Sequence, residues 1–288
     1  MHRMLLDTSS LTYRAFFALP TSIRDPQGRP VNAVRGVLDM HARLLADHRP
    51  DEVVHVFDHD WRPAPRVAAY DGYKAQRPDE PEDLTPQFVL LRTVLAAFGL
   101  PMVEAPGWEA DDAIGTLCAQ AGPDDRLDVV TGDRDLLQLV RDPAPPVRVL
   151  FTLRGVSELA VFDEAGVLER YGIPADRYVD FAILRGDASD GLPGVRGIGE
   201  KTARQLIQRY GSLRELYADV DAQPPGMARN LRAAVEYVGA MQEIVPVERS
   251  VALDWTRTER DDRALEALAA EHALDGPINR LMEAMDAL

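Results

Sequence analysis

The sequence predicts an α/β fold in which helices cover both faces of a parallel β-sheet, followed by a helical half. Over roughly the first 170 residues, short apolar runs rich in β-forming residues alternate with stretches of helical period, which is typical of parallel sheets. From about Gly172 onward the strand pattern disappears and only helical pieces follow. We therefore expect an α/β domain over residues 1–170 and a helical domain over residues 171–288.

Each expected element is a short run with one clear period. The expected strands are Met4–Leu6, Val53–Phe57, Leu127–Thr131, Val147–Phe151 and Glu158–Phe162. The helices between the early strands are Val34–Leu45, Phe88–Phe98 and Ala113–Ala121. The later helices are Tyr178–Leu184, Thr202–Tyr210, Met227–Val238, Arg263–His272 and Pro277–Met285. Strands that are apolar throughout, like the early ones, are buried on both faces of a sheet.

The composition is that of a soluble globular protein. Of the 288 residues, 46% are hydrophobic and 27% are charged, which excludes a disordered chain. The single cysteine, Cys118, excludes an intramolecular disulfide framework. No apolar run approaches the roughly 18 residues of a membrane span, and the first residues turn polar too early for a signal peptide. We expect a cytoplasmic protein with no membrane partner.

The net charge is −15, from 32 basic and 47 acidic residues. An acidic chain repels nucleic acid on average, so the charge alone favours a metabolic enzyme. The position of the carboxylates changes this interpretation. Asp7 and Asp58 directly follow expected strands, Asp133 and Asp135 come soon after another, and a further group opens a helix at Glu109, Asp111 and Asp112.

The carboxyl ends of parallel strands lie at one edge of a sheet, where ligands bind in open α/β folds. Any one of these residues could be only a helix N-cap. A cluster of like charges, however, costs stability unless cations neutralise it. Oxygen ligands alone favour Mg²⁺ or Mn²⁺, and the histidines show no zinc-type spacing.

A glycine-rich segment follows the acidic pair Asp187 and Asp190, whose i, i+3 spacing puts both on one face of a turn. The segment Gly194–Ala203 departs from a P-loop because Glu200 intrudes and no strand precedes it. It suits a helix–hairpin–helix turn over residues 194–210, in which backbone N–H groups face a phosphate. Five basic residues against one acidic between Gly194 and Arg214 support that interpretation. The alternative is a purely structural turn.

A long insertion, residues 59–87, has neither the period of a strand nor that of a helix. Its first part, Arg62–Arg77, is basic and contains Tyr70 and Tyr73, whereas Asp79–Asp83 is acidic. Such an insertion between a strand and a helix is typical of a lid, an arch or a binding loop. A plain surface loop is the alternative.

Together these segments resemble the bacterial 5′→3′ exonuclease / flap endonuclease family, related to the 5′-nuclease domain of DNA polymerase I. The matching segments are LLDTSSLTYRAFFALP, VFD, YKAQRP, GWEADDAIGTL, VTGDRDLLQLV and LRGDASDGLPGVRGIGEKTARQL. They cover roughly residues 3–250 in the family's order. The resemblance implies a PIN-like parallel sheet, a helical arch near residues 60–87 and a DNA-binding helix–hairpin–helix motif. We expect a stand-alone nuclease, because no polymerase region follows.

The resemblance implies two metal sites holding Mg²⁺ or Mn²⁺. The first draws on Asp7, Asp58, Glu109 and Asp111, with Asp112 and Asp133 nearby. The second draws on Asp135, Asp187 and Asp190. The implied catalytic residues are Lys74, Arg77, Asp133 and Asp187. With nine acidic residues in the site, −15 + 9 leaves −6 for the rest of the chain.

The resemblance also implies DNA contacts. Tyr13 and Arg14 match positions beside the active site. The arch supplies Arg66, Tyr73, Lys74 and Arg77, and the hairpin supplies Gly197, Gly199, Lys201 and Thr202, where K⁺ binds through carbonyls. Tyr70 and Tyr73 are candidates for stacking on unpaired bases.

Three departures from the family pattern bear on the metal sites. Thr8 follows Asp7 where the family has Gly, Gly191 stands where the family has Asn, and Asp60 is an additional candidate ligand.

The expected reaction is hydrolysis of phosphodiesters at DNA 5′ ends and 5′ flaps by two metal ions. The implied substrates are DNA with a 5′ flap, a nick or a 5′ overhang, in replication and repair, including primer processing. The protein is expected to be a monomer with polymerase and ligase partners. The alternatives are a non-catalytic protein that binds branched DNA, a PIN-like ribonuclease and, more remotely, a metal-dependent phosphatase.

Overall fold

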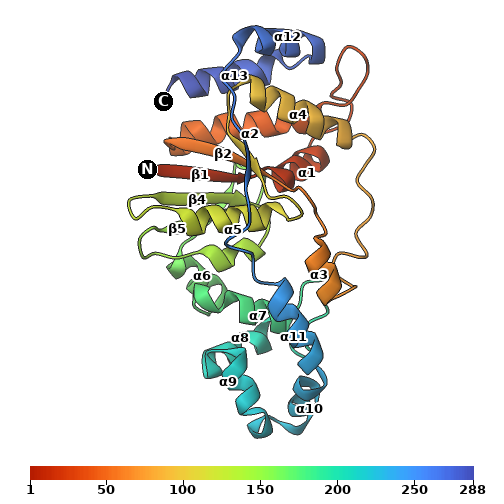
Figure 1. Cartoon of the computed structure of the whole chain (residues 1–288), viewed down its shortest axis with the longest axis vertical. Helices are drawn as coiled ribbons and strands as arrows, with labels where there is room; N and C mark the ends of the chain where they lie inside the picture. Colours follow the sequence, from red (N-terminus) through yellow and green to blue (C-terminus); the bar gives the residue numbers. More distant parts are fainter.

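A seven-stranded sheet organises the computed structural model, which describes residues 1–288 (Figure 1). The strand order is β6-β5-β4-β1-β2-β3-β7. The strands are β1 (His2–Asp7), β2 (Glu52–Phe57), β3 (Met102–Glu104), β4 (Arg126–Thr131), β5 (Val147–Thr152), β6 (Leu159–Phe162) and β7 (Asp254–Thr256). The five central strands are parallel, whereas β6 and β7 pair antiparallel at the edges. The expected α/β class is confirmed, although β3, β7 and the antiparallel edges were not expected.

Helices cover both faces of this sheet. One face packs against α1 (Thr8–Ala18), α2 (Asn32–His48) and α4 (Thr85–Ala97), and the other against α5 (Ala110–Gln120). Strand β1 shows the division, because Met4 and Leu6 belong to the apolar cluster under α2 and α4, while Leu5 belongs to the cluster under α5. Side chains alternate across a strand, so an apolar strand is buried on both faces.

The second half is helical and continues the core beneath α5. Its helices are α6 (Glu164–Tyr171), α7 (Tyr178–Arg185), α8 (Glu200–Tyr210), α9 (Leu213–Ala218), α10 (Pro225–Ala233) and α11 (Val235–Ile244). Short 3₁₀ turns are η1 (Asp135–Leu139), η2 (Ala175–Arg177) and η3 (Val220–Ala222). One cluster of 42 buried residues runs from the sheet into these helices. The two halves of the chain therefore share one continuous core.

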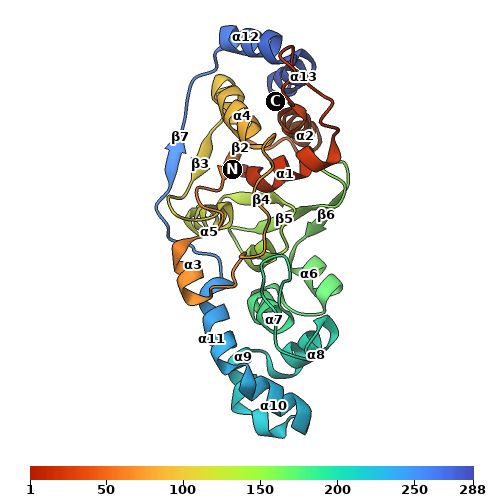
Figure 2. The ribbon, with the colours of Figure 1, turned by 90° about the vertical axis from the view of Figure 1, so that its right-hand side faces the viewer.

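The last 35 residues return to the sheet. Strand β7 pairs with β3, and α12 (Asp262–His272) and α13 (Asp275–Asp286) pack on α4 and α2. Figure 2 shows these two helices at the opposite end of the molecule from α10. We had expected residues 171–288 to form one helical unit, and this segment departs from that expectation. The apolar stripe of a helix shows that one face is buried, but not which partner covers it.

The expected helical arch is mostly loop. A six-residue helix, α3 (Ala64–Ala69), is followed by turns over residues 71–76 and by irregular chain up to α4. This connection runs along the outside of the molecule between α3 and α4 (Figure 1). Prolines at positions 63, 65, 78 and 81 limit helix here, because proline cannot continue a helical hydrogen-bond ladder. None of the helices is long and apolar enough to cross a membrane.

The C-terminal helices are integral to the core, which gives the first testable prediction. Leu281 of α13 is fully buried among the residues under α2 and α4. Leu281→Ala is expected to lower the free energy of unfolding by about 2–5 kcal/mol, because it removes buried methyl groups and leaves a cavity. Denaturant unfolding measures this, with Leu288→Ala as the control because Leu288 is 60% exposed. Equal stability of the two variants would contradict the packing described here.

Candidate active site

The carboxyl edge of the parallel strands carries a cleft of about 430 Å³ floored by carboxylates. Strand β1 ends at Asp7, while Asp58 and Asp133 follow the neighbouring strands β2 and β4. Helix α5 adds carboxylates from its first turn. The acidic residues that line the floor are Asp7, Asp58, Glu109, Asp111 and Asp133. The structure thus brings together five of the nine expected metal ligands.

Asp7 is held in place from two sides. Its carboxylate caps α1 by accepting a hydrogen bond from the Ser10 backbone N–H at 3.2 Å, and it accepts another from the Thr131 hydroxyl at 2.7 Å. Burial raises the pKa of Asp7 to about 7, helped by the negative charges of Asp58 and Asp133. The side chain therefore keeps its proton to higher pH than an ordinary aspartate does, as expected of a buried carboxyl among like charges.

Burial and nearby negative charge also raise the pKa values of neighbouring carboxylates. Burial and then the charge of Glu109 raise the pKa of Asp58, although the Ala110 N–H donates to it at 2.7 Å. Burial and the charge of Asp133 raise the pKa of both Asp111 and Asp135. Nearby like charges and loss of water both favour the neutral acid. The raised pKa values therefore indicate that negative charge outweighs positive charge in the cluster.

A second group of carboxylates lies beside this cleft. A small pocket between the two halves is lined by Asp111, Asp135 and Asp190, which places Asp135 and Asp190 together. One carboxylate oxygen of Asp135, Oδ1, is buried without any hydrogen-bond partner. Asp187 accepts from the Ser189 N–H at 2.9 Å, and its pKa is lowered because hydrogen bonds and nearby arginines outweigh its burial.

These donors fit a divalent cation in their chemistry. They are hard oxygen ligands, the pKa values of Asp7 and Asp135 are raised, and Asp135 has an orphaned buried oxygen. The side chains do not close around an ion, since no three of the His, Cys, Asp or Glu side chains form a ready coordination group. The structure therefore gathers oxygen donors that suit a divalent cation around one cleft, but no three of them are placed to share an ion.

Cations from the loop after β2 occupy several of the carboxylates instead. Lys74 and Arg66 both form buried ion pairs with Glu109, and the Tyr73 hydroxyl donates to the same carboxylate at 2.5 Å. Arg77 pairs with Asp190 at 2.7 Å. Lys74 and Arg77 also line the cleft.

Two expected DNA contacts and one expected metal ligand are placed elsewhere. Arg66 and Tyr73 are only 4% and 3% exposed and do not line the cleft, whereas Lys74, although 5% exposed, does line it. Asp112 is fully buried, accepting from Arg66 Nη2 at 2.7 Å and from the Glu248 N–H at 2.8 Å. With Glu109 it also forms the capping box of α5. The pattern of the sequence identified their neighbourhood but not their burial.

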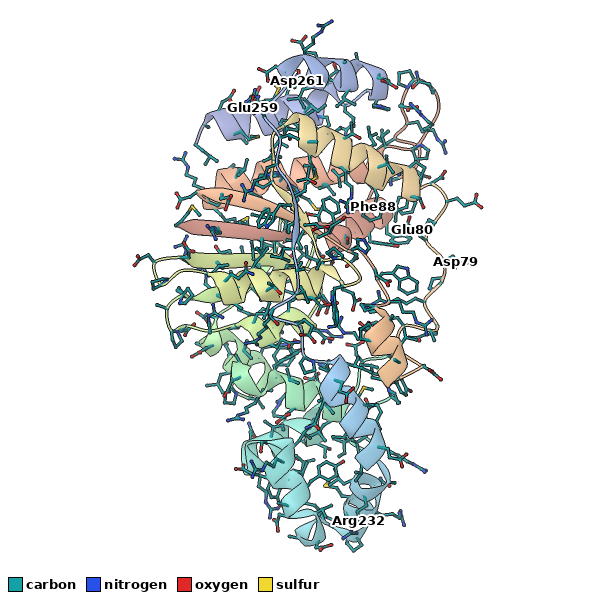
Figure 3. The ribbon with its side chains drawn as sticks, viewed as in Figure 1. Asp79, Glu80, Phe88, Arg232, Glu259 and Asp261 are labelled. Atoms are coloured by element: carbon teal, nitrogen blue, oxygen red, sulfur yellow. The ribbon has the colours of Figure 1, made fainter.

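The residues of α1 and the hairpin lie apart from the carboxylate floor. Tyr13 lines the wall of the cleft, donating to Glu80 at 3.0 Å and packing on Phe88, and Figure 3 labels the latter two beside α1. Arg14 lies against Gly132. The turn containing Gly197 and Gly199 precedes α8, with Lys201 and Thr202 in its first turn, and it does not border the cleft.

Two aromatic residues at the mouth of the cleft were missed. Phe17 and Trp61 line the same cleft and are 72% and 47% exposed. The matching segment LLDTSSLTYRAFFALP contains Phe17 but assigns it no role, and no period or motif marks Trp61, because the meaning of both depends on exposure next to the carboxylates. Tyr70 and Asp60 also differ from expectation. Tyr70 packs edge-on against Tyr237, and Asp60 accepts from the Arg62 N–H outside the cleft lining.

A carboxylate-floored cleft at the edge of an α/β sheet, bordered by basic residues, defines a nuclease of the phosphodiester-hydrolysing class. Residues 2–172 match the family described as 5′-3′ exonuclease, N-terminal resolvase-like domain, and residues 173–266 match 5′-3′ exonuclease, C-terminal SAM fold. The chain belongs to the 5′-3′ exonuclease family.

Similar proteins agree with this assignment. A 5′-3′ exonuclease of Streptomyces coelicolor is 46% identical over 99% of this chain and 100% of its own length. DNA polymerase I of Mycobacterium tuberculosis is 44% identical over 88% of this chain, which is 28% of that protein. A structure of divalent metal ions (zinc) bound to the bacteriophage T5 5′-exonuclease has the same fold, with a TM-score of 0.68, 17% identity and 99% coverage of both chains.

The raised pKa of Asp7 predicts how stability depends on pH without metal. The folded state binds a proton up to about pH 7, whereas the unfolded carboxyl releases it near pH 4, so stability falls as pH rises through this window. Asp7→Asn removes the charge and keeps a capping side chain. We expect it to raise the free energy of unfolding at pH 8 in EDTA by about 1–3 kcal/mol, and to change it little at pH 4.

The measurement is denaturant unfolding at both pH values. The exposed Asp124, changed to Asn, serves as the control. A less stable Asp7→Asn protein at pH 8 would show that Asp7 is compensated in the metal-free molecule.

Proposed function

We propose that the chain hydrolyses phosphodiesters at DNA 5′ ends and 5′ flaps with two or more Mg²⁺ or Mn²⁺ ions, during replication and repair. The observation that carries the proposal is the group of five carboxylates in one cleft, several with raised pKa values. The family assignment supports the 5′ polarity, and the resemblance to DNA polymerase I supports a replication role.

The divalent ions, when bound, would supply an activated water and stabilise the leaving oxygen. Asp7, Asp58, Glu109, Asp111 and Asp133 would hold the first, and Asp135, Asp187 and Asp190 the second. Asp112 would hold Arg66 and Glu109 in position, through its contact with the guanidinium and through the capping box. Carboxylates that now share loop cations would then exchange them for metal ions.

That exchange frees two cations for the substrate. In the metal-free molecule Lys74 balances Glu109 and Arg77 balances Asp190. Once metal ions neutralise the carboxylates, Lys74 and Arg77 can face the scissile phosphate from the cleft wall. Positive charge placed there stabilises the negative charge that develops in phosphoryl hydrolysis.

The duplex would be held away from the cleft. The turn at Gly197 and Gly199 presents the N-terminus of α8 without a side-chain cap, beside Lys201 and Thr202, and such a helix start suits a backbone phosphate. A K⁺ ion bound by its carbonyls would complete the contact. The T5 flap endonuclease has been crystallised with DNA and metal ions. We further propose a cytoplasmic monomer that works with a polymerase and a ligase.

A 5′-end-labelled flap duplex tests the proposal, with Mn²⁺, Mg²⁺ or EDTA added. We expect cleavage with either metal and none with EDTA. Release of the intact flap identifies endonuclease action, and release of mononucleotides identifies exonuclease action. Tight binding without cleavage under every condition would favour a non-catalytic DNA-binding protein, and preference for an RNA flap would favour a ribonuclease.

Single carboxylate substitutions test the residues. Asp133→Asn and Asp187→Asn are each expected to lower the flap cleavage rate by more than about 100-fold, since even groups that only orient metal ligands contribute 10–100-fold. Flap affinity, measured by anisotropy, should stay within a few-fold of the unmodified protein. Asp124→Asn should cleave normally. Near-normal turnover of Asp133→Asn would refute this ligand assignment.

A further inference from the structure

The mouth of the cleft is poor in cations. Its lining contains seven carboxylates, and against them stand only Lys74 and Arg77. The seven are Asp7, Asp58, Asp79, Glu80, Glu109, Asp111 and Asp133. Both cations are already paired, with Glu109 and Asp190. Metal ions at the floor would leave Asp79 and Glu80 uncompensated at the rim. Away from the scissile phosphate, a DNA strand that enters here meets more carboxylates than cations, so its other phosphates contribute little to binding.

Exposed aromatic surface is available at the same place. Phe17 is 72% exposed and Trp61 is 47% exposed, and both line the cleft. Large apolar side chains left in water beside a functional cleft mark a binding site more often than isolated ones elsewhere. Aromatic rings stack on unpaired bases of any sequence, and this contact does not depend on phosphate charge.

Phe17 continues a track that leads from the carboxylates. Ser10, Tyr13, Arg14 and Phe17 line one shallow groove on α1, and their i, i+3, i+4 and i+7 spacing puts them on one helix face. The opposite face of α1 is buried. Asp7 caps the start of this helix and Phe17 lies in its last turn, about 15 Å away at 1.5 Å per residue. The groove therefore runs from the floor outward and ends at an exposed ring.

Trp61 is presented by a firmly anchored backbone. The preceding residues His59 and Asp60 donate their N–H groups to the Trp108 carbonyl, at 3.2 and 3.0 Å. The guanidinium of the following residue, Arg62, donates to the carbonyls of Tyr73 and Asp71, at 2.7 and 2.8 Å. A side chain that is half exposed on a fixed backbone is preorganised for contact and loses little entropy on binding.

The expected stacking residues are not free for this role. Tyr73 is buried on Glu109, and Tyr70 packs on Tyr237. Tyr13 is tied to Glu80 and packs on Phe88. Among the aromatic side chains of the cleft, Phe17 and Trp61 alone combine high exposure with a place at the mouth.

We propose that Phe17 and Trp61 are a stacking site for unpaired bases of the 5′ single strand, so that the enzyme recognises a flap by its bases next to the cleavage site. The inference rests on the proposed function. It assigns substrate selection to two residues that neither hold metal nor touch the scissile phosphate.

The test is a double-mutant cycle that removes the two rings from the protein and the bases from the DNA, separately and together. Binding is measured by anisotropy in EDTA, using 5′-flap duplexes whose single strand carries normal bases or abasic sites. Removing both rings in Phe17→Ala/Trp61→Ala is expected to weaken binding of the normal flap by about 5–150-fold, the range for one stacked base. The unmodified protein should lose a similar factor on the abasic flap, and the variant should not distinguish the two flaps.

Matched controls separate stacking from damage to the fold. Trp61→Phe keeps a ring and should retain most of the affinity. Trp255→Ala should bind normally, because Trp255 is 40% exposed on β7, outside the cleft. Equal thermal unfolding of the variants confirms folding. A double variant that loses the same factor on normal and abasic flaps, or loses nothing, overturns the inference.

The outcomes also separate this inference from the proposed function. If the unmodified protein cleaves the flap with Mn²⁺ while the double variant still distinguishes normal from abasic flaps, only the stacking site is wrong. If the unmodified protein neither binds nor cleaves the flap under any condition, the proposed function fails and the stacking site fails with it.

Discussion

The constraint on which the site depends is the crowding of carboxylates at the carboxyl edge of a parallel sheet. Strands β1, β2 and β4 are neighbours and run the same way, so the acidic residues at their ends must meet. Burial and mutual repulsion then raise the pKa values of Asp7, Asp58 and Asp111. The fold therefore concentrates negative charge at this edge of the sheet, and cations are needed to neutralise it.

The loop after β2 supplies positive charge that neutralises part of this negative charge. Its cations Arg66, Lys74 and Arg77 reach α5 and the turn at residues 187–191. Gly191 allows the close contact, because a Cβ there would lie 2.4 Å from the Gly72 carbonyl oxygen. The departure from Asn at this position thus has a packing reason. These cations neutralise part of the negative charge of the site.

The sequence was informative where local patterns decide the structure. Parallel strands that end in acids predicted the convergence at Asp7, Asp58 and Asp133, and helical periods located most helices. It was uninformative where distant contacts decide. The burial of Arg66 comes from α5 and Pro246, and the return of α13 comes from contact with α2. The exposure of Trp61 likewise depends on the tertiary fold.

Titration of the metal-free protein with Mn²⁺ by calorimetry, in buffers of different ionisation enthalpy, tests the central claim most directly. Because buried carboxyls with raised pKa values must ionise to bind metal, the account predicts two or more bound ions and release of protons at pH 6, with less proton release at pH 9. Metal binding without proton release at pH 6, or no binding, would contradict the claim that the crowded carboxylates form the metal site.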